Sequence, residues 1–185
     1  MKKQETTFGW HLVGATLRDG SAIPRDGAWL PKIENIKLCE RGYHGSLHPF
    51  DALKYAPGET LCYCEYRGQI FHGSDKFVAE QRRIVTRMDA TEMLRYYARM
   101  QAVSVVHLWD AQDVVLDYLM TGEEQLRASA QASARDSAWD SARDSVRASV
   151  RASVQASAWA SAWASVRDDF ATLVYECFGI KEGEK

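Results

Sequence analysis

Alternating hydrophobic and polar positions in the first half of the chain predict β-strands. The alternation is clearest from Thr60 to Arg67 and separates two faces: Leu61, Tyr63 and Glu65 on one, and Cys62, Cys64 and Tyr66 on the other. Other stretches have the strand-like mixture of aromatic and β-branched residues between turns, namely residues 8–17, 36–39, 69–72 and 77–87. We expect the arginines of the last stretch to lie on its solvent side: Arg82, Arg83 and Arg87.

Helical spacing of apolar residues appears at three places before residue 123. Residues 49–56 begin with Pro49, which the first turn of a helix tolerates. Residues 89–107 carry apolar side chains three and four positions apart, and Asp89 or Thr91 can cap this helix. Residues 111–120 form a third amphipathic pattern, which Gly122 closes.

The most regular stretch runs from Ser129 to Asp168, where a serine begins each of ten consecutive four-residue units. Ala or Val follows the serine, then Arg, Trp or Gln, then Ala or Asp. No Gly or Pro occurs between Glu123 and Phe178, so the region is expected to be helical. Because a helix turns about 100° per residue, each unit advances by about 40°, and the serine stripe spirals around the helix.

The same drift predicts that the apolar face changes sides near Gln155. Two groups of side chains then point in opposite directions: Trp139, Val146 and Val150 in one, and Trp159, Trp163 and Phe170 in the other. Either one long rod carries two opposite apolar faces, or the chain bends near Gln155 and folds back. Three tryptophans on such a helix indicate an interface. The alternative is a rod that expanded by slippage and has no function of its own.

These patterns predict the fold class α+β, in which a small mixed or antiparallel sheet domain precedes helices. The expected segments are a sheet domain at residues 1–88, a helical neck at 89–122, the helical repeat region at 123–178 and a tail at 179–185. The chain of 185 residues has 23 Lys and Arg against 25 Asp and Glu, which gives no general attraction to nucleic acid or anionic membranes. Without a long apolar run or a secretion signal, a cytoplasmic protein is expected.

Candidate chemistry is sparse. His44 and His48 lie near Cys39, Cys62 and Cys64, but the C-x-x-C pairs of a structural zinc module are absent, so no metal site is expected. These cysteines and Cys177 are interpreted as reduced thiols. The chain has no G-x-S-x-G, G-x-x-x-x-G-K or H-E-x-x-H motif, so none of the chemistries that those motifs carry is supported.

The segment from Cys39 to Tyr55, which we call the signature segment, carries a family resemblance. It reads C-E-R-G-Y-H-G-S, then P-F-D-A-L-K-Y, and a strand ending in Gly68 follows. It resembles an uncharacterised domain family of bacteriophages and bacterial mobile elements with the pattern C-x-x-G-[FY]-H-x-[CS]-x-x-P-[LF]-D-x-L-x-Y. The resemblance covers roughly Gly9 to Arg95 and implies no established activity.

A more distant similarity is to the ADP-ribosyltransferase fold. That fold uses an H-G-[ST] triplet for the NAD ribose, a stacking tyrosine and a catalytic glutamate. The resemblance implies His44 and Ser46 in the triplet, Tyr55 or Tyr63 as the stacking residue, and Glu65 or Glu80 as the acid. In this chain, however, the triplet overlaps the G-Y element instead of lying on a separate strand, and Trp10-His11 lacks a following G-[ST].

The leading functional hypothesis is therefore an accessory protein of phage or mobile-element type, without a cofactor, that forms homo-oligomers or binds a protein partner through its repeat. The alternative is a protein that binds NAD or another nucleotide through the N-terminal domain, with His44 and Glu65 as candidate catalytic residues. Nucleic-acid binding through Arg143, Arg147 and Arg151 is disfavoured because acidic residues stand close by: Asp136, Asp140 and Asp144.

Overall fold

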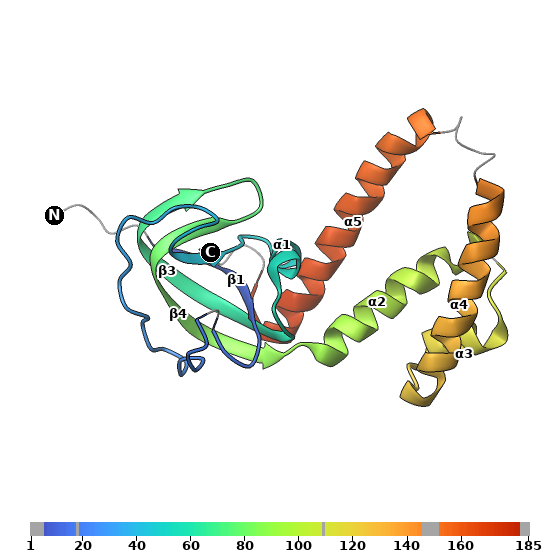
Figure 1. Ribbon diagram of the computed structural model, residues 1–185, viewed down its shortest axis with the longest axis horizontal. Coiled ribbons are helices and arrows are strands. Elements are labelled where there is room, and N and C mark those ends of the chain that lie inside the picture. Colours follow the sequence, from blue (N-terminus) through green and yellow to red (C-terminus); the bar gives the residue numbers. More distant parts are fainter. Residues whose placement is uncertain (1–5, 18, 109, 146–151, 182–185) are drawn as a thin grey trace. The chain divides into compact units, whose positions relative to one another are not determined.

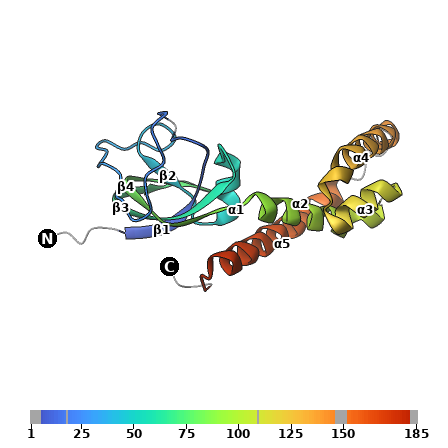
Figure 2. The same cartoon turned by 90° about the horizontal axis from the view of Figure 1, so that it is seen from below.

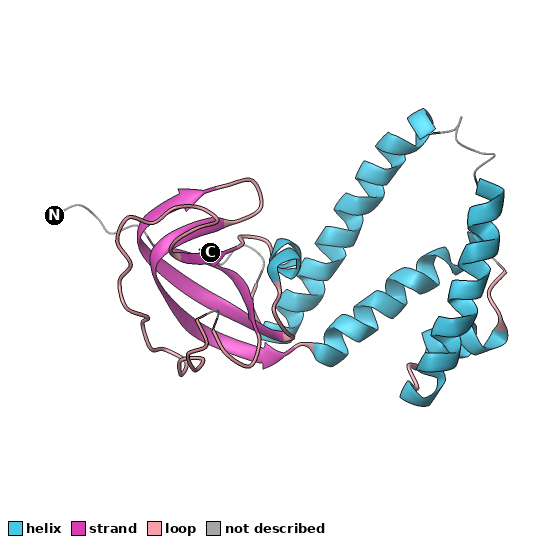
Figure 3. Cartoon of the chain, viewed as in Figure 1, coloured by secondary structure: helices cyan, strands magenta, loops and turns pink. Residues whose placement is uncertain are grey.

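The protein is α+β, and its computed structural model describes residues 6–17, 19–108, 110–145 and 152–181 (Figure 1). The chain forms two compact units. Unit 1 combines Met1–Thr91 with Arg167–Lys185, and unit 2 is the intervening stretch Glu92–Val166. The strands belong to unit 1, and most of the helical residues belong to unit 2 (Figure 3). Unit 2 is therefore inserted into the sequence of unit 1.

A four-stranded antiparallel sheet forms the centre of unit 1 in the described part of the chain. Its strands follow the order β1-β3-β4-β2, with β1 at Thr6–Val13, β2 at Tyr43–Gly45, β3 at Thr60–His72 and β4 at Phe77–Asp89. The two edges of the sheet meet at one point, because Trp10 and Ser46 exchange both backbone hydrogen bonds at 2.8 and 3.0 Å. This bridge between the edge strands curls the sheet into a half-barrel.

The exposed edge of β4 is covered by the loop that precedes β2. Backbone N–H groups of Gly27, Leu30 and Ile33 donate to the carbonyls of Ile84, Arg82 and Glu80, at 2.7, 2.9 and 2.9 Å. The loop thus runs along β4 as a substitute strand and satisfies carbonyl groups that would otherwise invite pairing with another chain.

Each face of the sheet is covered by a different part of the chain (Figure 2). The inner face carries a fully buried cluster that includes Cys62, Cys64, Tyr66 and Phe77. On the other face, Trp10 packs against the end of the C-terminal helix α5 (Ala152–Phe178), with its ring centroid 5.0 Å from that of Phe178. Phe170 and Val174 of the same helix are fully buried there. We call this second side the helix face.

Most of the predicted strands are confirmed, with three differences. The strand predicted at residues 8–17 is β1, which ends at Val13. The stretches at 60–67 and 69–72 form one strand, because Gly68 adopts a φ of +93° and an irregularity between Arg67 and Ile70 absorbs it without a turn. The predicted strand at 36–39 is wrong. Lys37 pairs with Arg41 there, and Cys39 has a φ of +68°, so the chain reverses direction.

The predicted helices are present. Pro49–Ala52 forms α1 and continues as the 3₁₀ helix η1 (Leu53–Tyr55), and His48 caps it by accepting the N–H of Phe50 at 3.2 Å. Asp89 accepts the N–H of Thr91 at the start of α2, at 2.9 Å. The helices of unit 2 are α2 (Thr91–Val105, whose first residue belongs to unit 1), η2 (Val106–Leu108), α3 (Asp113–Thr121), α4 (Glu124–Ser145) and the first part of α5. Val115, Leu119 and Ala130 form the core between α3 and α4.

The repeat region is helical wherever it is described, in α4 and α5. Val146 and Val150 lie outside the described residues. Trp139, Trp159 and Trp163 stand in helices, but their side chains lie outside the description. Gln155 lies inside α5, so the chain continues as a helix through this residue. The predicted change of apolar face near Gln155 depends on side chains outside the description and stays a prediction.

Candidate functional site

His44 is held in place by the turn that precedes it. Its Nε2 atom accepts the backbone N–H of Cys39 at 2.9 Å, across the reversal of the chain between these residues. Its carbonyl oxygen accepts the hydroxyl of Tyr66 at 3.1 Å and lies 3.5 Å from the guanidinium of Arg82. The side chain of His44 thus holds the preceding turn, and its backbone carbonyl connects β2 to β3 and β4.

Ser46, the next residue predicted to bind a ligand, is only 2% exposed. Its backbone supplies both hydrogen bonds of the bridge to Trp10 that joins the sheet edges. Gly45 precedes it at a close approach, since a Cβ atom at this position would lie 2.4 Å from the hydroxyl oxygen of Tyr66. The H-G-S triplet therefore closes the half-barrel.

The two candidate stacking tyrosines lie in separate surroundings. Tyr55 is 44% exposed, and its hydroxyl donates to Asp75 at 2.9 Å at the tip of the β3–β4 hairpin. Tyr63 instead stacks on Phe8, with ring centroids 5.5 Å apart, and packs against Trp10 at 4.9 Å. Neither contact places an aromatic ring beside His44.

The candidate acids are engaged in ion pairs. Glu65 accepts the Nε–H of Arg83 at 2.7 Å, and Glu80 lies 3.3 Å from the ammonium of Lys32. Glu65 and Tyr63 share the helix face of β3, opposite Tyr66. The residues that the ADP-ribosyltransferase resemblance brought together are therefore distributed over different parts of unit 1 in the described structure.

A buried polar cluster on the inner face was missed by the sequence reasoning. Arg82, expected on the solvent side of β4, is 4% exposed, so that prediction is wrong. The register pairs Arg82 with Tyr66 and places His11 opposite Cys62. We call these residues the inner polar cluster: His11, Cys62, Cys64, Tyr66 and Arg82. The bulge in β4, between the partners of Tyr63 and Cys64, shifts the alternation that would have revealed the buried position.

Arg82 is a buried cation with few partners. Its Nε is buried and has no hydrogen bond within the described structure, and its guanidinium carbon lies 5.6 Å from the ring centroid of Tyr43. Burial of a guanidinium is costly unless its hydrogen bonds are made. Arg82 therefore depends on the His44 carbonyl and Tyr66 and fixes β2 and β3 against β4.

Burial and the charge of Arg82 shift the titration of the cluster. Burial, then the charges of Arg82 and His44, hold the pKa of His11 well below its usual value. Burial alone would raise the pKa of Cys64, but hydrogen bonds with Cys62 and Tyr66 and the charge of Arg82 bring it below the usual value. The pKa of Cys62 is raised by its hydrogen bond to Cys64 and by burial. His11 is thus neutral near pH 7, and Cys62 keeps its proton.

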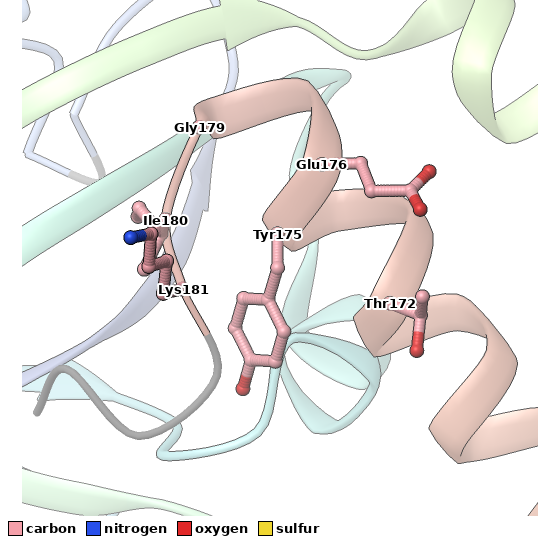
Figure 4. A pocket seen from close by; sticks show the side chains of 6 residues that line it. All are labelled: Thr172, Tyr175, Glu176, Gly179, Ile180 and Lys181. Atoms are coloured by element: carbon pink, nitrogen blue, oxygen red, sulfur yellow. The ribbon is translucent and has the colours of Figure 1, made fainter.

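One surface hollow of about 360 Å³ lies at the C-terminal end of α5 (Figure 4). It is lined by Thr172, Tyr175, Glu176, Gly179, Ile180 and Lys181. All six residues belong to one helix end and the residues that follow, and Figure 4 shows Thr172 and Glu176 directed away from Ile180 and Lys181. Side chains from separate elements do not converge here as they do in a catalytic pocket.

A metal site and a membrane span are both absent from the described residues. In that part of the chain, no three His, Cys, Asp or Glu side chains are grouped closely enough to hold a metal ion. Among the helices described, none has both the length and the apolar composition needed to cross a bilayer. Four cysteines are unpaired in the structure: Cys39 and Cys177 are exposed, and Cys62 and Cys64 are buried.

Of the six residues predicted at an interface, Phe170 is the one whose side chain the structure describes. It is fully buried in unit 1, where its ring packs on Phe50 with centroids 5.6 Å apart. Nearby, Arg167 donates to both carboxylate oxygens of Asp51, at 2.6 and 3.0 Å. Sequence reasoning missed this pair because Arg167 belongs to the last repeat unit and looks like the other repeat arginines.

Comparison with known proteins finds a family match over part of unit 1 and the first residues of unit 2. Residues 25–96 match the family described as Domain of unknown function (DUF7666). The match contains the whole signature segment, in agreement with its resemblance to an uncharacterised domain family, and excludes β1 and α5. No curated protein matches the chain. No solved structure matches it either.

Proposed function

We propose that this chain is an accessory protein of phage or mobile-element type that self-associates through its four-residue repeat. The observation that carries the proposal is the position of three tryptophans in the described helices. Trp139 stands in α4, and Trp159 and Trp163 stand in α5, all at the third position of a repeat unit. Large aromatic side chains on helices rich in Ala and Ser provide the anchors of helix–helix interfaces.

The contacts of the candidate ligand-binding and catalytic residues support a role other than catalysis for unit 1. In the signature segment, His44 and Ser46 bind backbone groups and Tyr55 binds Asp75, while Glu65 of β3 pairs with Arg83. An acyl- or phosphoryl-transfer site would instead need a nucleophile, a base and an oxyanion donor around one open position. In this proposal, unit 1 is the folded base that holds the repeat.

Sedimentation equilibrium over a concentration series tests self-association. The full chain is expected to sediment as a dimer or a larger species. Replacement of Trp139, Trp159 and Trp163 by Gln, which the repeat itself carries at this position in Gln131 and Gln155, should weaken association at least tenfold. Trp29→Gln, which removes a tryptophan outside the repeat, is the matched control and should associate like the wild type.

Two outcomes would contradict the proposal. One is a wild-type chain that stays monomeric up to about 1 mM, far above the dissociation constants of ordinary homodimers. The other is a triple variant that associates as strongly as the wild type. Circular dichroism of the triple variant shows that its helix content is retained, so that loss of association is not loss of folding.

The nucleotide alternative has a separate test. Isothermal titration calorimetry with NAD, ADP-ribose and ATP, on the wild type and on His44→Ala, detects a site at the signature segment. Heat in the wild type that disappears in His44→Ala would support the alternative. Absence of heat in both proteins would remove it.

A further inference from the structure

Arg82 carries a positive charge that is buried without an acidic partner in the described structure. The residue is 4% exposed, and none of the ion pairs among the described residues includes it. Asp26 is an acidic residue whose charge reaches the inner polar cluster, but it is paired with Arg87 at an N···O distance of 3.1 Å. Burial of a guanidinium without a negative partner costs free energy of folding. The ion pairs of the described residues therefore leave the charge of Arg82 unbalanced.

The hydrogen bonds of Arg82 are incomplete as well. Its Nη1 atom lies 3.5 Å from the carbonyl oxygen of His44, which is a long contact, and its side chain also binds Tyr66. Its Nε atom is buried and has no acceptor in the described structure. Few buried polar groups of native proteins lack a partner, and an ordered water or ion is a common explanation for those that do. The Nε–H of Arg82 thus marks a place where an acceptor is missing.

Three neighbours of Arg82 in the inner polar cluster do not balance its charge. A hydrogen bond to Cys64 raises the pKa of Cys62, and burial raises the pKa of Tyr66, so both groups keep their protons near pH 7. His11 is neutral there because burial holds its pKa well below the usual value. Cys62 and Tyr66 are 0% exposed, whereas His11 is half-buried. Solvent therefore reaches the cluster at His11.

We propose that Arg82 binds a small inorganic monoanion of the chloride class at its Nε atom, inside the half-barrel. One negative charge balances one guanidinium, and the ion accepts the hydrogen bond that the protein leaves unmade. A singly charged ion is favoured over phosphate or sulfate, because the cost of burying an ion rises with the square of its charge. The fully buried neighbours Cys62, Cys64 and Tyr66 block a larger organic ligand. The site lies within unit 1 and does not depend on self-association.

Thermal unfolding of the full chain with chloride as the probe tests this site. Sodium gluconate replaces sodium chloride at constant ionic strength, so that general screening stays the same. An anion that binds only the folded chain stabilises it by mass action, so each tenfold rise in chloride above the dissociation constant should raise the Tm by about 3 to 6 °C. A Tm that does not change between about 1 and 200 mM chloride would overturn the inference.

Two arginine variants separate the site from general salt effects. Arg82→Met removes the guanidinium at similar length and should abolish the chloride response. Arg83→Met is the matched control, because Arg83 adjoins Arg82 on β4 but has a side chain that is 38% exposed and bound to Glu65. This variant should keep the full response. Equal responses of the two variants would mean that chloride does not act at Arg82.

Bromide provides a direct test that does not require a variant to fold. In crystals of the wild type grown with bromide, anomalous scattering should locate the ion within hydrogen-bonding distance of the Nε atom of Arg82. An ordered water or a protein acceptor at this atom, without bromide, would overturn the inference.

Cys64 is the competing source of negative charge. Burial raises its pKa, but hydrogen bonds with Cys62 and Tyr66 and the charge of Arg82 bring it below the usual value. A Cys64 thiolate would take the place of the anion. The ultraviolet absorbance of thiolates near pH 7, compared between the wild type and Cys64→Ser, decides between them. Equal absorbance is expected, and a thiolate signal that disappears in Cys64→Ser would show that Arg82 already has its counterion.

Discussion

Asp51 and Arg167 are 116 positions apart in the sequence and form a bidentate ion pair in unit 1, with N···O distances of 2.6 and 3.0 Å. Asp51 stands in the signature segment, in α1, and Arg167 in the last repeat unit. The pair therefore joins the domain of unknown function to the repeat helix that completes its core. Lys54 lies 3.4 Å from the same carboxylate and gives it a second, weaker partner.

Removal of either partner should destabilise unit 1. Arg167→Met leaves a nearly buried carboxylate with Lys54 alone, and we expect a loss of about 2 kcal/mol in the free energy of unfolding. Asp51→Asn should cost a similar amount. The double variant should lose clearly less than the sum, since each single change already breaks the pair. Urea unfolding followed by circular dichroism measures the cycle, and strict additivity would show that the two residues do not interact.

Stability should fall as the pH drops below about 6.5, the usual pKa of histidine. Burial and the charge of Arg82 lower the pKa of His11 in the folded chain, so the unfolded chain binds the proton more readily. The contribution of neutral His11 to the free energy of unfolding is complete above pH 6.5. It is lost, by up to about 1.4 kcal/mol per pH unit, as the pH falls toward the pKa of His11 in the folded chain. His11→Gln should flatten this part of the stability curve.

The histidine also reports on Arg82. In Arg82→Met the positive charge is absent, so the pKa of His11 should rise toward its usual value while burial still keeps it low. NMR titration of the His11 ring protons measures this shift. An unchanged pKa would mean that Arg82 does not act on His11.

Cysteine reactivity should divide the four thiols into two pairs. Cys39 and Cys177 are exposed and should react with Ellman's reagent in the native protein. Cys62 and Cys64 are fully buried, and the pKa of Cys62 is raised by its hydrogen bond to Cys64, so both should react only after denaturation. Two thiols per native chain and four per denatured chain are expected. Rapid reaction of all four would contradict the closed inner cluster.

Gly45 should not accept a larger residue. A Cβ atom there would lie 2.4 Å from the hydroxyl oxygen of Tyr66 and 3.0 Å from Phe77, and both rings are fully buried. We expect Gly45→Ala to cost about 2 to 3 kcal/mol in unfolding free energy. Gly20→Ala is the comparison: no atom lies within 4 Å of its added Cβ, so only its φ of +82° opposes the change, at a cost of about 1 kcal/mol.

Local signals were sufficient for most elements. Alternation predicted the first part of β3, the mixture of aromatic and β-branched residues predicted β4, and Pro49 marked the start of α1. Gly122 marked the end of α3, and the absence of Gly and Pro predicted the helices of the repeat region. The error at 36–39 arose because four strand-like residues do not reveal a turn that depends on hydrogen bonds between Lys37 and Arg41. Gly68 is typical of a strand end, but β3 continues past it because an irregularity in the strand pairing between Arg67 and Ile70 accommodates this residue.

The sequence by itself determined the kinds of element, the regular array and the signature segment, since propensity and periodicity act over a few neighbouring residues. Only the tertiary structure decided that the end of the array returns to unit 1, that Arg82 is buried and that His44 and Ser46 hold the sheet edges together. These outcomes depend on contacts between residues far apart in the chain. Arg167 and the other repeat arginines have nearly the same local sequence, and only the position of Asp51 in the folded chain distinguishes them.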